Sequence, residues 1–228
     1  MNPSIPLATK EALSQAGWCL FRDAEFACNI LLAACQFGTP VSQSGMQVVG
    51  VLKPHPSETA RPNSTSLLYG FEAFPLHTDM AHWPLPPRYL IMRAKMPSPD
   101  VPTLIVDSQK LKLDERSRSL WHRASWRVLK VRNPFLCSMF FEHRGGGGIR
   151  WDACTMSPNG KLATDLESDI LSSFQELLIT SSTVICWESP EDILVIDNWR
   201  MLHARSAVPE YAAARTLERV LIREKNID

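Results

Sequence analysis

Two short segments of the sequence carry side chains that can bind a metal ion. The first covers residues 74–79, in which His77 and Asp79 stand two residues apart. The second covers residues 197–203 and ends on His203. If the first segment is a strand, His77 and Asp79 point to the same side, because successive side chains of a strand point to opposite sides. With a distant histidine, they would supply the two imidazoles and one carboxylate of an iron(II) site.

Such a ligand set leaves part of the metal's coordination sphere free for chemistry. An iron(II) ion held by two imidazoles and one carboxylate keeps open positions for a bidentate cosubstrate and for dioxygen. Chance is the competing explanation, because the chain has 6 histidines and an isolated His-x-Asp is more often a structural pair. The context of the motif must therefore decide between the two.

The elements that would position these residues are mostly strands. Strands are predicted at residues 18–21, 48–52, 71–79, 88–93, 103–107, 126–131, 183–187 and 193–196, and residues 53–66 read as a loop. A hairpin is predicted to join residues 137–143 to 149–154 through the glycine run at 145–148. Helices are predicted at residues 9–16, from Asp23, from Asp114 to about Ala124 and at 162–178.

This order of elements favours a mainly β fold with flanking helices. The expected architecture is an antiparallel double sheet, that is, a double-stranded β-helix (jelly roll, cupin-like). In such a fold, inward side chains from strands far apart in sequence converge in one cavity, which is what His77, Asp79 and His203 require. We expect one domain over residues 1–228, because a chain of this length can bury a sizeable core.

Composition limits the partners that we expect. The 24 basic residues balance 24 acidic ones, so net charge indicates neither nucleic acid nor an anionic membrane, and a small-molecule substrate is expected. The 6 cysteines form no Cys-x-x-Cys pair, which argues against structural zinc and for reduced thiols in the cytoplasm. Neither a leader-like start nor a long apolar run indicates secretion or membrane insertion. The sequence is compatible with an oligomer as well as with a monomer.

With these motifs in order, the sequence resembles the iron(II)/2-oxoglutarate-dependent dioxygenases of the taurine dioxygenase and clavaminate synthase-like family. That family pairs His-x-Asp with a distant His, places a Thr about two dozen residues after the Asp, and places an Arg about ten to fifteen residues after the final His. Thr103 and Arg215 stand at these spacings from Asp79 and His203. The resemblance covers residues 74–220.

The resemblance implies a cofactor, a cosubstrate and a reaction. His77, Asp79 and His203 would bind Fe(II), while Thr103 and Arg215 would hold the distal carboxylate of 2-oxoglutarate. The implied reaction consumes O2, releases succinate and CO2, and hydroxylates an unactivated carbon. Halogenating relatives carry a small residue in place of the carboxylate, so the retained Asp79 disfavours halogenation. Desaturation and cyclisation stay open.

Four further residues are candidates for contact with the substrate. If residues 215–221 are extended, Arg219 shares a face with Arg215 at about 13 Å along the strand, too far to grip the same carboxylate symmetrically. Arg219 would therefore meet either the substrate's acid group or an interior acid. Arg150 resembles a residue that lines the cavity in some small relatives. His82 and Trp83 follow the motif closely, but packing or exposure to solvent is the plainer interpretation for both.

Two other features have plain alternatives. The glycine run at 145–148 is expected as a flexible hairpin tip, with a mobile lid as the bolder interpretation. Asn198 is expected as a turn former.

The function that these observations favour is hydroxylation of a small amino-acid-like or carboxylate metabolite, with natural-product biosynthesis as one setting. A non-catalytic cupin-like module with a metal site is the alternative, and the retained Thr103 and Arg215 weigh against it. A metal-dependent hydrolase ranks last, because no paired Glu stands near His77 and Asp79. The sequence leaves open the identity of the substrate and whether it is free or bound to a carrier.

Overall fold

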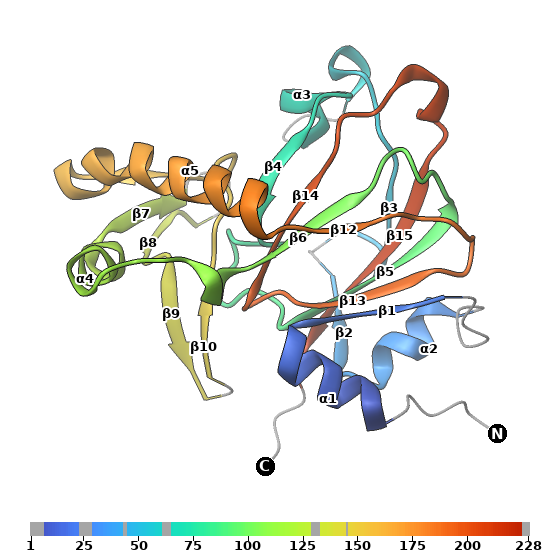
Figure 1. Cartoon of the computed structure of the whole chain (residues 1–228), viewed down its shortest axis with the longest axis horizontal. Helices are drawn as coiled ribbons and strands as arrows, with labels where there is room; N and C mark the ends of the chain where they lie inside the picture. The colour runs from blue at the N-terminus through green and yellow to red at the C-terminus, as the bar shows by residue number, and fades with distance from the viewer. Residues whose placement is uncertain are drawn as a thin grey trace.

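Two antiparallel sheets face each other and form the body of the protein (Figure 1). A computed structural model describes residues 7–22, 29–42, 45–60, 65–128, 133–144 and 146–224. The major sheet has the order β1 (Trp18–Phe21), β13 (Ile193–Asp197), β5 (Tyr89–Met96) and β15 (Thr216–Arg223), with β2 (Thr39–Val41) and β3 (Val49–Leu52) both paired to β15. The minor sheet has the order β12 (Thr183–Ile185), β6 (Thr103–Asp107), β14 (Met201–Arg205) and β4 (Phe74–His77). This jelly roll with flanking helices confirms the predicted fold class.

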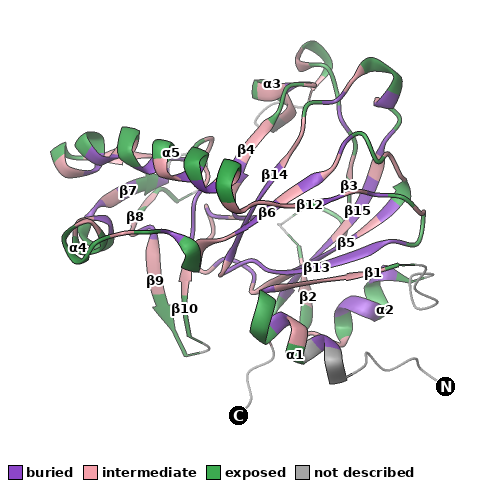
Figure 2. Ribbon diagram, in the orientation of Figure 1, coloured by how far each residue is buried: buried purple, intermediate pink, exposed green. Residues whose placement is uncertain are grey.

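The core between the sheets follows from strand alternation. On β5, Leu90, Met92 and Ala94 are buried in the cluster that also contains Ile105 from the minor sheet. Ile91, between them in sequence, belongs to a different cluster on the outer face of the major sheet. Figure 2 shows the central strands as the most buried part of the chain. Because both faces of β5 are covered, its residues read as a nearly continuous apolar run.

Helices and smaller sheets cover the outer faces. α1 (Leu7–Ala16) and α2 (Ile30–Cys35) lie against the major sheet. On the side of the minor sheet, a second core gathers around Trp121, Trp126 and Trp151. The elements that build this side are α4 (Glu115–Arg123), α5 (Lys161–Ser181), the sheet of β11 (Met156–Asn159), β7 (Ser125–Val128) and β8 (Phe135–Cys137), and the ribbon of β9 (Phe140–His143) and β10 (Gly146–Ile149). Short helices complete the order: η2 (Ser57–Thr59), α3 (Thr65–Tyr69), η3 (Ser108–Lys110) and η4 (Glu210–Ala212).

Several predicted elements have different limits in the structure. α1 begins at Leu7, so Thr9 lies inside the helix rather than at its cap. The helix predicted from Asp23 is wrong at Asn29, which has an extended backbone and caps α2 through its side chain, whose Oδ1 accepts the N–H groups of Leu31 and Leu32. Residues 23–28 lie outside the described residues. The predicted loop at 53–66 contains η2 and the start of α3.

The glycine run is part of a strand rather than a hairpin tip. Residues 146–148 lie in β10, which pairs with β9; residue 145 lies outside the described residues. A Cβ atom on Gly148 would lie 2.5 Å from the Phe141 ring and 2.9 Å from Trp199 Cβ, so this glycine lets the ribbon pack closely.

Among the helices of the described ranges, none combines the length and apolar composition needed to cross a bilayer.

Candidate metal centre and cosubstrate pocket

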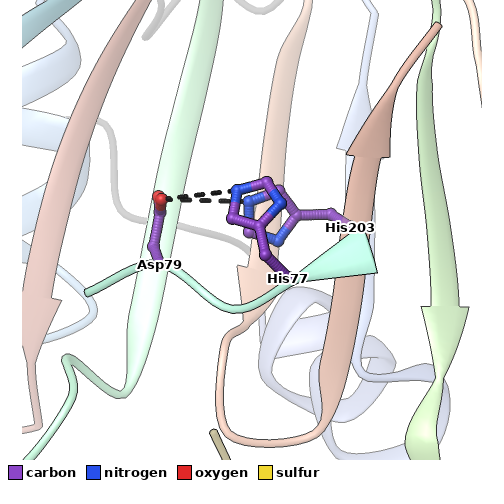
Figure 3. A group of neighbouring side chains, drawn as sticks. All are labelled: His77, Asp79 and His203. Carbon is purple, nitrogen blue, oxygen red and sulfur yellow. Dashed lines mark ion pairs between the residues drawn. The ribbon is translucent and has the colours of Figure 1, made fainter. Parts of the chain in front are cut away.

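His77, Asp79 and His203 meet at one point of the minor sheet. His77 ends β4 and lies opposite His203 of β14 in the sheet register. Figure 3 shows both imidazoles pointing toward the carboxylate of Asp79, which lies in the loop beyond β4. The Asp79 Oδ1 atom is 3.9 Å from Nε2 of each histidine, and one ligand atom from each residue lies within 4.8 Å of the others. The sequence analysis thus placed the convergence correctly.

The expectation that His77 and Asp79 share one strand face is wrong, because the strand ends between them. The N–H of Thr78 donates to the carbonyl oxygen of Trp151 at 2.8 Å, outside the sheet ladder. Met80 follows with a φ of 55°, in the left-handed region. A tight turn, rather than strand alternation, brings the carboxylate back toward the imidazole.

Asn198 fixes the position of Asp79 through its backbone. The Asn198 Oδ1 atom accepts the Asp79 N–H at 2.7 Å, and its Nδ2 donates to the Asp79 carbonyl at 3.0 Å and to the Pro87 carbonyl at 3.0 Å. Its side chain is fully buried, so no water competes for these bonds. Asn198 is therefore a positioning residue for the candidate ligand, beyond the turn former that the sequence indicated.

Hydrogen bonding orients one histidine, and burial keeps the other neutral. Nδ1 of His77 lies 3.0 Å from the Pro75 carbonyl oxygen, which can only accept, so this nitrogen carries a hydrogen and Nε2 is the atom that faces Asp79. Burial, together with the charges of His77 and Arg219, lowers the pKa of His203 to about 3. The His203 imidazole thus has the neutral form that metals bind.

The carboxylate also fits a metal ion. Burial alone would raise the pKa of Asp79, but Arg219, His203 and His77 together hold it below its ordinary value. The other carboxylate oxygen, Oδ2, is buried and has no hydrogen-bond partner in the described part of the chain. That oxygen is therefore available to a metal ion, while Arg219 pairs with Oδ1. Two imidazole nitrogens and this carboxylate are the donor set of a facial iron(II) site.

Arg219 contacts the same carboxylate from the major sheet. Its Nη1 atom lies 2.8 Å from Asp79 Oδ1, and β15 carries it into the space between the sheets. Of the two alternatives for Arg219, an interior acid is the one that the structure shows. Its side chain keeps 18% exposure, so the guanidinium is not sealed off from solvent.

Thr103 and Arg215 lie together as the resemblance implies. The Thr103 hydroxyl accepts from Trp187 Nε1 at 3.0 Å and lies 3.5 Å from Arg215 Nη2. Burial and the nearby charge of Arg205 lower the pKa of Arg215 to about 10. Nε of Arg215 is buried without a hydrogen-bond partner among the described residues. A buried guanidinium with unused donors is a site for an anion, and its planar fork suits a carboxylate.

Arg205 is a second cation of this pocket that the sequence analysis missed. It stands two residues after His203 on β14, and it lies opposite Thr103 in the antiparallel pairing of β14 with β6. Its Nη2 donates to the carbonyl oxygens of Gly70 at 2.9 Å and Glu72 at 2.6 Å. Alternation along β14 was the available signal, because His203 and Arg205 must share a face of that strand.

The structure gives Arg150 a role in packing. Its guanidinium donates to the carbonyl oxygens of Trp83 at 2.8 Å and Pro84 at 2.9 Å, with Ala81 at 3.4 Å, and its Cζ lies 4.8 Å from the centre of the Phe141 ring. These carbonyls occupy both terminal nitrogens, so Arg150 supports the turn at residues 81–84, while its Nε has no hydrogen-bond partner among the described residues.

His82 and Trp83 lie on the turn that Arg150 supports. Both are half-buried, and Trp83 packs against the core between the sheets. Burial lowers the pKa of His82, while the charges of Asp152 and Asp79 act in the opposite direction. His82 therefore lies within electrostatic range of both carboxylates, near the candidate metal centre.

Comparison with solved structures shows the same fold. No protein-family model and no curated protein matches the sequence. An asparagine oxygenase in complex with Fe(II), 2S,3S-3-hydroxyasparagine and succinate is similar with a TM-score of 0.74 and 14% identity, over 95% of this chain and 78% of that chain. The non-heme iron oxygenase OrfP in complex with Fe, succinate and (3S)-hydroxy-L-Arg gives 0.64 and 20%, over 85% of this chain and 62% of OrfP. The PvcB protein from Pseudomonas aeruginosa gives 0.66 and 20%, over 93% and 78%.

Proposed function

We propose that this protein is an iron(II)/2-oxoglutarate-dependent oxygenase that hydroxylates an unactivated carbon of a small amino acid or related carboxylate and releases succinate and CO2. The observation that carries the proposal is the combination of two sites. A largely buried His77–Asp79–His203 cluster and a buried Thr103–Arg215 pair meet at the minor sheet. His77, His203 and Thr103 belong to that sheet, and Arg215 reaches Thr103 from the segment just before β15. Two structures of the same fold contain iron and succinate, which supports the proposal.

Each part of the site has a defined task in this proposal. His77, Asp79 and His203 would hold iron(II), which together with 2-oxoglutarate and O2 supplies the oxidising chemistry. Arg215 would pair with the distal carboxylate of 2-oxoglutarate. Because Trp187 already donates to the Thr103 oxygen, the Thr103 hydroxyl hydrogen is available for the same carboxylate.

Arg219 is our candidate for the substrate's acid group. One of its nitrogens pairs with Asp79, and the rest of its fork can take a second carboxylate, since a guanidinium offers five donors. The ligands in the two oxygenase complexes are hydroxylated amino acids, which carry such a group. His82, whose pKa the charge of Asp79 affects, and Trp83 beside it are further candidates for contact with the substrate.

Spectroscopy of the anaerobic protein tests the cofactor and cosubstrate. Fe(II) with 2-oxoglutarate should give a visible charge-transfer band, which His203→Ala should abolish and Arg215→Gln should shift to higher 2-oxoglutarate concentration. An Arg223→Gln protein is the matched control, because Arg223 ends the same strand with an exposed side chain. Metal binding with no effect of 2-oxoglutarate would instead indicate a non-catalytic cupin-like module.

A product screen tests the reaction. Succinate formation is measured across amino acids, peptides and natural-product intermediates, and each mixture is analysed by mass spectrometry. A gain of one oxygen indicates hydroxylation, whereas a loss of two hydrogens indicates desaturation or cyclisation. If no mixture yields succinate and the anaerobic protein shows no band, the proposal is wrong.

A further inference from the structure

A continuous series of side chains leads from the candidate metal centre to a cysteine. The ring of His77 packs edge-on against Phe74, with ring centres 4.5 Å apart. Phe74 in turn packs edge-on against Tyr69 of α3 at 5.1 Å. The Tyr69 hydroxyl oxygen lies 3.8 Å from the Sγ atom of Cys154. Four side chains from α3, β4 and the loop before β11 thus form one contact path.

The outer end of this path is the part that is easiest to oxidise. A phenol and a thiol lose an electron and a proton far more readily than a phenyl ring, and a thiol can proceed to sulfenic acid. Tyr69 and Cys154 are both half-buried. Burial and the contact with Cys154 raise the pKa of Tyr69 to about 12, so the phenol stays protonated and its proton must leave together with an electron.

Asp152 provides a place for that proton. Its charge acts on Tyr69, and its carboxylate accepts the Cys154 N–H at 2.8 Å and the Thr155 hydroxyl at 2.8 Å. The phenol, the thiol and a carboxylate are therefore neighbours at one end of the path, while His77 lies at the other. A reactive oxidant at the metal would meet this path whenever no substrate carbon is present.

We propose that Tyr69 and Cys154 form an internal oxidation site, which reduces the metal centre when it activates dioxygen without a substrate. This inference rests on the proposed function. Activation of O2 with one 2-oxoglutarate yields succinate and CO2 and leaves one oxygen atom that requires two electrons and two protons to become water. Cys154 supplies them through Tyr69, one electron and one proton at a time, as its thiol reacts with water to give sulfenic acid. The sum is 2-oxoglutarate, O2 and thiol to succinate, CO2 and sulfenic acid.

The chain contains a matched control cysteine. Cys35 is exposed at the end of α2, where peroxide from solution would reach it more easily than Cys154. The protein with Fe(II) and 2-oxoglutarate is exposed to air without substrate, in the presence of catalase, and is then denatured in dimedone. Peptide mass spectrometry measures dimedone on each cysteine. We expect label on Cys154 to rise with succinate while label on Cys35 stays at the level of the iron-free protein.

Two variants separate an internal path from other oxidation. Tyr69→Phe keeps the ring contact with Phe74 but lacks the hydroxyl. The amount of dimedone label on Cys154 should therefore fall to the amount measured on Cys35. Cys154→Ser should lengthen the lifetime of a tyrosyl radical seen by freeze-quench electron paramagnetic resonance, and the double variant should lose that signal. Thermal melts check that each variant folds.

The outcomes distinguish this inference from the function on which it rests. Succinate formation with unlabelled Cys154, equal label on both cysteines, or label on Cys154 that survives Tyr69→Phe each overturns the internal oxidation site alone. A wild-type protein that consumes no 2-oxoglutarate with or without substrate overturns the proposed function and the internal oxidation site together.

Discussion

Asp79 is held by two separate groups, and each acts on a different part of the residue. Asn198 holds its backbone, Arg219 pairs with carboxylate oxygen Oδ1, which also faces both histidines, and oxygen Oδ2 has no hydrogen-bond partner among the described residues. A short side chain with few rotamers needs this much support to keep a ligand atom in place, because the residue lies in a turn rather than in a strand.

Removing the amide of Asn198 should therefore weaken metal binding. We expect Asn198→Ala to lower affinity for Mn(II) or Co(II) by about 10–100-fold, the range for partners that orient metal ligands. Calorimetric titration of the metal-free protein measures this. Asn159→Ala is the control, because Asn159 bonds only to an exposed arginine in the described structure. An Asn198→Ala protein that folds and binds metal like the wild type contradicts the role given to Asn198.

Arg150 should matter for stability and not for the metal centre. Lysine cannot reproduce its fork of hydrogen bonds to Trp83 and Pro84, so we expect Arg150→Lys to lower the free energy of unfolding by about 2 kcal/mol. Urea denaturation measures the loss, and Arg144→Lys on the exposed ribbon is the control. The charge-transfer band with Fe(II) and 2-oxoglutarate should persist. A lost band with unchanged stability would return Arg150 to the ligand site.

Spacing along the chain was sufficient to predict some contacts of the candidate site and insufficient for others. Thr103 and Arg215 stand at the family's spacing from the motif, and the structure places them together, so a resemblance is enough to propose the pair. Asn198 acts through an amide that bridges residues 119 positions apart, and nothing in the local sequence signals such a contact. Arg150 has the type and position of a ligand-binding residue, but only the fold shows that backbone carbonyls occupy its two terminal nitrogens.

At the scale of elements, β15 carries both a residue of the candidate site and a residue that stabilises the major sheet. Arg219 points toward Asp79, while Glu218 points to the outer face and pairs with Arg93 and Lys95 of β5. Alternation along one strand thus separates the arginine that pairs with Asp79 from the ion pairs of Glu218 on the outer face.

The Glu218 network should make stability depend on pH. Burial would raise the pKa of Glu218, but Arg93 and Lys95 hold it below 4.5, its ordinary value. Because the folded-state pKa is the lower one, the stabilisation is present above pH 4.5 and is lost as pH falls through the folded-state pKa. We expect Glu218→Gln to lower the free energy of unfolding by roughly 1 kcal/mol near neutral pH.

Urea titrations at neutral and acidic pH check this expectation. The difference between wild type and Glu218→Gln should shrink on acidification, while Glu176→Gln on the exposed face of α5 should show little difference at either pH. A Glu218→Gln difference that grows in acid would show that the pKa of Glu218 is shifted upward.

Strands could be predicted from the sequence where apolar runs were clear. They could not be predicted where backbone packing, rather than side-chain type, determined the structure. The strands at 103–107 and 193–197 are apolar runs between turn residues, and both match the structure within one residue. The glycines at 146–148 resemble a loop by composition, yet they pair with β9, and at Gly148 the contact with Phe141 and Trp199 leaves no room for a side chain.

At the scale of the whole molecule, ligands should raise the melting temperature. The candidate metal ligands come from β4, β14 and the loop that Asn198 holds, so a metal ion would tie these segments together. A ligand at about 100 times its dissociation constant stabilises a folded protein by roughly 2.7 kcal/mol. We expect Mn(II) with 2-oxoglutarate to raise the melting temperature of the wild type by several degrees.

Differential scanning fluorimetry with and without a chelator measures that shift. His203→Ala should show no response to Mn(II), whereas Arg215→Gln should respond to Mn(II) but gain little more from 2-oxoglutarate. A His203→Ala protein that is stabilised like the wild type would place the metal elsewhere.

The two halves of the candidate site belong to different sheets. His77, His203 and Thr103 come from the minor sheet, whereas Arg215 directly precedes β15 and Arg219 lies in the middle of β15, in the major sheet. A dicarboxylate that spans from the metal to Arg215 must therefore match the gap between the sheets. In the proposed function, the packing of the sandwich core, through side chains such as Ile105 and Leu217, would then limit the chain length of a keto acid that fits between the metal and Arg215.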